Sequence, residues 1–269
     1  FVSGQIAARR FDFLRHPLTA VRTALGPAVA LSHARTQGDE RLVDVTTDGL
    51  TFTLAIDGAT RLPTRVAWMT DSSQLGDHAV ETRFDAYRSV SGLQLPTRLS
   101  ARIDRFPSQE IRILEQTIDA EVGNLAAPAN VSSAAPPPTT GPTPIPVSVE
   151  EVAKGIWHLT GQTHHSMLVE FSDHLLLIEA PNEARTLAVL AKAKELRPDK
   201  PVTTLLVTHH HSDHTGGVRA AVAEGVTEII THKSNVAYIQ EILTRPHTIN
   251  PDRLTKAPVS SLPTITAID

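Results

Sequence analysis

The stretch LLVTHHHSDHTGG at residues 205–217 is the most informative part of this sequence. It holds four of the 13 histidines of the chain, together with Asp213. The residues that lead into it, VTTLLVT at 202–208, form an apolar run typical of a strand buried on both faces. Gly216 and Gly217 then permit a tight turn into a helix. We therefore expect the histidines at the carboxyl end of a strand in an α/β sheet, where such folds usually place their sites.

The spacing of these residues predicts a metal site. In an extended segment side chains alternate, so His209, His211 and Asp213 are expected to project to one side and His210 to the other. His214 follows as the chain turns into the helix. Imidazole and carboxylate are good zinc ligands, and the pairs His209–His211 and Asp213–His214 suit two ions roughly 3.5–4 Å apart. The alternative, a solvated polar loop, gives no reason for these residue types at these offsets.

The segments around the motif alternate between strands and helices. Short apolar strands are predicted at 155–161, 166–171, 174–180 and 227–232, and helices at 182–196, 217–224 and 234–243. This alternation predicts an α/β domain with crossover connections.

The first half of the chain has a different pattern. Residues 1–25 are expected to be helical, and residues 28–122 alternate apolar and polar side chains as half-buried strands do. Asp-Gly pairs at 48–49 and 57–58 mark tight turns. We expect a curved antiparallel half-barrel with a helix against it at 1–125, a Pro-rich linker at 126–147 and the α/β domain at 148–269. The overall class is α+β.

Composition narrows the function classes. The chain has 269 residues, 41% hydrophobic and 20% charged, with a net charge of -4, and no dense basic run that a nucleic acid would require. It has no cysteine, which excludes disulfides and thiolate ligands. No apolar stretch approaches the ~18 residues of a membrane span. The chain starts without Met, so we expect it to be part of a longer protein, either periplasmic or secreted or, otherwise, cytoplasmic.

The segment THHHSDHTGG resembles the H-x-H-x-D-H motif of metallo-β-lactamase-fold hydrolases, and residues 155–181 resemble the opening strands of that fold. The resemblance covers residues from about 148 to the end and implies an αββα domain. It also implies that His209 and His211 bind a first zinc ion, and that Asp213 and His214 bind a second. Asp213 would additionally orient the attacking hydroxide and act in catalysis.

Two departures from that family pattern are visible. The opening strands of the family commonly end in Ile-Asp, whereas this chain has Glu179, which either supports the metal site or is an ordinary strand-end carboxylate. The further metal histidine, bridging aspartate and final histidine of the family are not found. We therefore expect only the first half of that domain, with His232 and His247 in structural roles.

Two smaller features leave alternatives open. His164 and His165 begin a strand near the expected mouth of the site, where one of them touches substrate or both are turn or surface residues. The segments GATRLPTRV and YRSVSGLQLPTRL loosely resemble bacterial periplasmic lipoprotein-carrier half-barrels, which implies export and a groove for an apolar ligand.

The leading functional hypothesis is a metal-dependent hydrolase that uses a zinc-bound hydroxide to cleave an ester, thioester or lactam-like bond of a small molecule. The alternative is a non-catalytic exported module that binds a lipid or other ligand and carries an incomplete metal site. The oligomeric state is left open.

Overall fold

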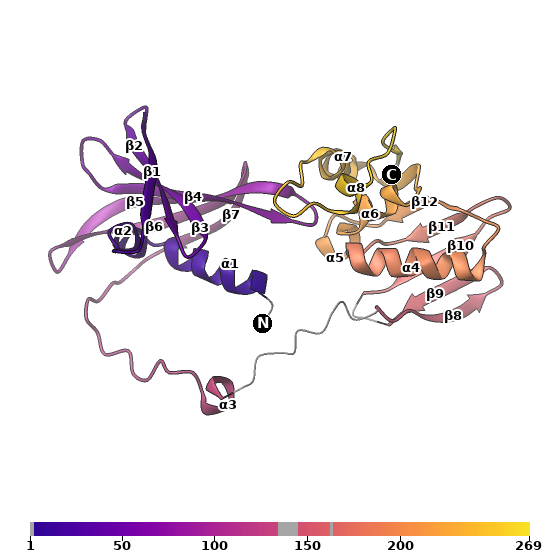
Figure 1. The fold of residues 1–269 in the computed structure, drawn as a ribbon, viewed down its shortest axis with the longest axis horizontal. Coiled ribbons are helices and arrows are strands. Elements are labelled where there is room, and N and C mark those ends of the chain that lie inside the picture. The colour runs from indigo at the N-terminus through magenta and orange to yellow at the C-terminus, as the bar shows by residue number, and fades with distance from the viewer. Residues whose placement is uncertain (1–2, 134–144, 162–163) are drawn as a thin grey trace. The chain divides into compact units, whose positions relative to one another are not determined.

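The fold comes from a computed structural model that describes residues 3–133, 145–161 and 164–269 (Figure 1). The chain divides into two compact units. The first comprises Phe1–Thr70 and His78–Thr139, and the second comprises Asp71–Asp77 and Thr140–Asp269. The sequence did not predict that the short segment Asp71–Asp77 groups with the second unit. The middle of the predicted linker lies outside the described residues.

The first unit is an antiparallel meander with two helices. Helices α1 (Ser3–Leu14) and α2 (Pro17–Ala24) confirm the predicted helical start, and the His16 side chain caps α2 by accepting from the backbone N–H of Leu18. Seven strands follow, and each pairs with the next along the chain. They are β1 (Ala30–Gln37), β2 (Glu40–Thr47), β3 (Leu50–Asp57), β4 (Pro63–Ser72), β5 (Gly76–Val90), β6 (Leu93–Ile103) and β7 (Phe106–Arg112).

The core of the first unit lies between the helices and one face of this sheet. Phe11 and Leu14 of α1 and Ala20 of α2 pack with buried strand residues such as Phe52. The ring of Phe11 stacks on Trp68, with centroids 4.8 Å apart. Strands β1 and β7 are exposed along their whole length and form the two edges, so the sheet is open rather than a closed barrel.

The second unit has one mixed sheet in the order β14-β13-β12-β11-β10-β9-β8. The pairings from β8 to β11 are antiparallel, and those from β11 to β14 are parallel, as crossover connections require. The strands are β8 (Ser148–Ala153), β9 (Ile156–Thr160), β10 (Ser166–Glu170), β11 (Leu175–Ile178), β12 (Val202–Val207), β13 (Glu228–His232) and β14 (Thr264–Ile268).

Helices cover one face of this sheet. The core joins Leu205 and Val207 of β12 to Val189 of α4 and Val218 of α6. On the other face Thr204 is buried and Leu206 is half-buried, so the prediction that β12 is buried on both faces is confirmed for one face and in part for the other. The helices are α4 (Glu183–Leu196), α5 (Ser212–Thr215), α6 (Val218–Ala223), a 3-10 turn (Lys233–Asn235), α7 (Val236–Thr244) and α8 (Arg253–Lys256).

Several elements were absent from the predictions. Strand β8 is exposed at every position and β14 is at most half-buried, so neither shows the apolar alternation that marks a core strand. The helices α3 (Ala129–Ser132), α5 and α8 have four residues each and are too short for a helical period. No helix in the described part of the chain combines the length and apolar character that crossing a membrane needs.

Candidate metal centre

The histidine motif begins where β12 ends, at the carboxyl edge of the parallel strands. His209 and His210 form the loop after Val207, and His211 is the N-cap of α5 with extended backbone angles. Asp213 and His214 lie in the helical turn itself. The predicted alternation therefore holds only as far as His211. Asp213 was expected in an extended segment, and that expectation was wrong because the helix starts one residue earlier.

His209 and His211 bring two ring nitrogens together. Nε2 of His209 lies 3.2 Å from Nδ1 of His211, and the ring planes are inclined at 74°. Two nitrogens bound to one tetrahedral zinc at about 2.0–2.1 Å would be separated by about 3.3 Å. The pair is thus spaced as two ligands of a single ion, and the same distance also permits a hydrogen bond between the rings.

Asp213 and His214 form a second pair beside the first. Oδ2 of Asp213 lies 3.5 Å from Nε2 of His214 and 3.1 Å from Nε2 of His164. The rings of His209 and His214 are 4.0 Å apart between centroids, so the two pairs adjoin. A hydrogen bond from its own backbone N–H, helped by the neighbouring histidines, lowers the pKa of the Asp213 carboxyl. The lowered pKa keeps this carboxylate in the ionised form that binds cations.

His164 reaches the site because of the strand pairing. Met167 near the start of β10 pairs with Ile178 at the end of β11, and β11 runs parallel to β12. The start of β10 and the ends of β11 and β12 therefore share one edge of the sheet. His164 contacts Asp213 of the motif, whereas Nδ1 of His165 lies 3.2 Å from Nε2 of His158.

Glu179 links the end of β11 to the motif. Its backbone is left-handed, with φ at 68°, which is rare for a residue with a side chain and marks strain typical of functional sites. Its Oε1 accepts from the backbone N–H and the hydroxyl of Thr208. Its Oε2 lies 3.2 Å from Nδ1 of His214, and both atoms are buried without an aligned hydrogen-bond partner. Of the two alternatives for Glu179, the contacts favour support of the site.

The donors fit a metal in chemistry and spacing. They form two pairs, and among the described residues no three His, Asp or Glu side chains close around one point as a metal site. If the Nδ1 of His214 carries the proton and faces Glu179, its Nε2 is left free as a ligand beside Asp213.

His210 borders the first pair without belonging to it. Its exposed ring is edge-on to His211, at 4.9 Å between centroids, and to Tyr238, at 5.9 Å. His232 caps the 3-10 turn by accepting from the backbone N–H of Ser234. His247 is 4% exposed, and its burial lowers the pKa of the imidazole. These contacts agree with structural roles for His232 and His247.

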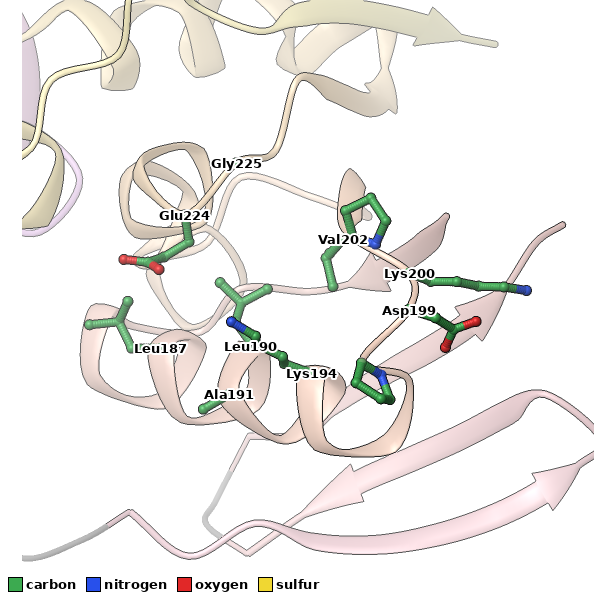
Figure 2. Close-up of a pocket in the computed structure, with 11 residues that line it drawn as sticks. Leu187, Leu190, Ala191, Lys194, Asp199, Lys200, Val202, Glu224 and Gly225 are labelled. Atoms are coloured by element: carbon green, nitrogen blue, oxygen red, sulfur yellow. The ribbon is translucent and has the colours of Figure 1, made fainter. Parts of the chain in front are cut away.

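A groove of about 570 Å³ lies away from the motif (Figure 2). It is bordered by Leu187, Leu190 and Lys194 of α4 and by Val202 at the start of β12. The motif follows the opposite end of the same strand. Since sites in parallel sheets lie at the carboxyl ends of strands, the groove does not mark the chemistry.

Comparison with known proteins supports the family indicated by the motif. Residues 159–260 match the model of the Metallo-beta-lactamase superfamily. A metallo-β-lactamase from Hirschia baltica is 28% identical, with a TM-score of 0.32, over 35% of this chain and 48% of that one. The metallo-β-lactamase FIM-1 from Pseudomonas aeruginosa, solved in a mono-zinc form, is 25% identical, with a TM-score of 0.33, over 39% of this chain and 50% of that one. The chain thus spans about half the length of these relatives.

Proposed function

Because residues 159–260 match the metallo-β-lactamase superfamily, we propose that the second unit carries the metal centre of a metal-dependent hydrolase. The observation that carries this proposal is the 3.2 Å separation of the His209 and His211 nitrogens, next to a second acid–imidazole pair at the carboxyl edge of the sheet.

The four ligands are proposed to act in pairs. His209 Nε2 and His211 Nδ1 bind one zinc ion, and Asp213 Oδ2 and His214 Nε2 bind a second. Glu179 faces the far nitrogen of His214 and keeps the ring oriented. Zinc, when bound, supplies Lewis acidity and allows water to lose a proton near neutral pH.

The chain's own residues then serve the hydrolysis. The lowered pKa of Asp213 keeps it ionised, so it can accept a hydrogen bond from the attacking water and orient it. His164, which contacts the same carboxylate oxygen, lies where it can touch a substrate. We propose a small ester, thioester or lactam-like substrate, since the net charge of -4 and the absence of a dense basic run disfavour a nucleic acid.

Zinc titration of the whole chain tests the proposal. We expect His211→Ala to weaken zinc binding at least 100-fold, because it removes one of two nitrogens that hold an ion. His210→Ala is the matched control and should bind nearly as the unmodified chain does, since His210 is not a proposed ligand and its ring only borders His211 and Tyr238. Equal losses in the two variants, or no zinc bound by the unmodified chain, would refute the assignment. The second outcome would favour the non-catalytic binding module.

A further inference from the structure

The segment Asp71–Asp77 touches the metal motif although the two are more than 130 residues apart in sequence. It belongs to the second unit, so its contacts lie within that unit. Nε2 of Gln74 donates to the backbone carbonyl of His210 at 3.0 Å and to the hydroxyl of Thr215.

These two acceptors are coupled to each other. Thr215 is fully buried, and its hydroxyl lies 2.9 Å from the carbonyl of His211, to which it donates. Gln74, Thr215 and the carbonyls of His210 and His211 therefore form one connected network. This network holds the peptide unit that joins His210 to His211 and the unit that follows His211, so it fixes the backbone beside the two residues whose ring nitrogens are 3.2 Å apart.

The segment is itself held firmly. The carboxylate of Asp77 accepts from the backbone N–H of Thr248 at 2.9 Å and from that of Ile249 at 3.1 Å. Its own backbone N–H donates to the carbonyl of Pro246 at 2.8 Å. A Cβ on Gly76 would lie 2.2 Å from that same carbonyl oxygen, so only glycine permits this approach.

Ser73 adds a close contact to the motif. A Cβ on Gly216 would lie 3.2 Å from Oγ of Ser73 and 2.7 Å from the carbonyl oxygen of Pro181. The backbone of the motif is therefore packed between this segment and the end of β11. The position of Gln74 is determined on both sides, by the anchored Asp77 and by the motif that it contacts.

We infer that Gln74 is a positioning residue of the metal centre, which acts through the backbone of the motif to hold His209 and His211 at ligand spacing. The expected effect of Gln74 on metal binding rests on the proposed function. Its effect on the backbone of the motif does not depend on metal. Loss of residues that orient metal ligands typically weakens metal binding by about 10- to 100-fold.

The test uses Gln74→Met, which keeps the length of the side chain and removes both N–H donors. Gln240→Met on α7, an exposed glutamine of the same unit, is the matched control. Hydrogen exchange is measured on the metal-free chain, at the amides of residues 214–217. Loss of one net hydrogen bond predicts exchange roughly 2- to 10-fold faster there. In a second arm, Co²⁺ alone is titrated, and Gln74→Met should bind it at least 10-fold more weakly.

The outcomes of the two arms separate the role of Gln74 from the proposed function. Faster exchange confined to 214–217, with weaker Co²⁺ binding, supports the inference. Unchanged exchange in Gln74→Met would overturn it, and so would an equal rise throughout the second unit, because that is global destabilisation. Gln74→Glu, which also lacks the donors, must behave like Gln74→Met if the donated hydrogen bonds matter. If the unmodified chain binds no Co²⁺, the proposed function fails while exchange still decides the role of Gln74.

Discussion

The buried ion pair of Arg219 and Asp252 allows a quantitative prediction for the second unit. Nε of Arg219 lies 2.5 Å from Oδ2 of Asp252, and Nη2 lies 3.2 Å from Oδ1. The two side chains are 7% and 13% exposed. Burial would raise the pKa of the Asp252 carboxyl, but hydrogen bonds from Arg219 and Thr255 lower it to about 2 from an ordinary 3.8.

The lowered pKa sets the size of the effect. Asp252→Asn keeps the shape and the cap of α8 but removes the charge. A difference of about 1.8 pH units corresponds to about 2.5 kcal/mol of unfolding free energy at pH 7. Because the folded pKa is the lower one, this stabilisation is present above pH ~4 and lost as pH falls. It decreases to about 1.3 kcal/mol at pH 3 and about 0.4 kcal/mol at pH 2.

Urea unfolding between pH 7 and pH 2.5 measures this difference. The chain has two tryptophans, and Trp157 packs in the core of the second unit while Trp68 packs in that of the first. In a Trp68→Phe background, fluorescence therefore reports the second unit alone. Glu150→Gln, an exposed position on β8, is the matched control and should leave the unfolding free energy within about 0.5 kcal/mol.

Two results would refute the reasoning. The first is a loss below about 1 kcal/mol at pH 7 in Asp252→Asn, which would mean that the pair does not offset its own desolvation. The second is a loss of constant size from pH 7 to pH 2.5, which would mean that the carboxyl does not titrate in this range and that shape rather than charge stabilises the fold.

Two further substitutions test the surroundings of the motif. Glu179→Gln should weaken zinc binding about 10-fold or more, because the neutral amide no longer orients His214. The control Glu195→Gln, on the surface of α4, should leave zinc binding unchanged. Equal zinc affinities in the two variants would contradict the role of Glu179. Gly217→Ala should lower the unfolding free energy by about 1–3 kcal/mol, measured by urea unfolding, because its Cβ would lie 2.0 Å from the hydroxyl of Thr186. An unchanged unfolding midpoint would show that the neighbouring side chains move aside without cost.

The sequence predicted most of the fold because apolar residues recur at regular helix or strand spacing in its core elements. The apolar run before His209 is a strand, and Asp48-Gly49 is a turn with both residues left-handed, at φ 48° and 76°. Strands β8 and β14 were missed because they lie at the edges of their sheet, where one face has little to bury. The resemblance to lipoprotein carriers and the predicted export stay predictions.

The candidate site was predicted in part for a related reason. The motif concentrates its donors within six residues, so their proximity follows from local spacing. His164, Glu179 and Gln74 reach it only through tertiary structure. The sequence left the roles of His164 and Glu179 open, and the strand pairing, which brings their strand ends to one edge of the sheet, favours the site for both. Gln74 lies in a segment whose sequence does not indicate that it contacts the motif.

The grouping of Asp71–Asp77 with the second unit also has a consequence for biosynthesis. A ribosome makes these seven residues well before it makes residues 140–269, so the second unit cannot reach its final state from its own continuous sequence. A protein that starts after the Pro-rich segment would leave the backbone N–H groups of Thr248 and Ile249 without the carboxylate of Asp77. The second unit is therefore larger than the continuous segment that carries the proposed metal ligands, and dividing the chain at the prolines removes Asp71–Asp77 from it.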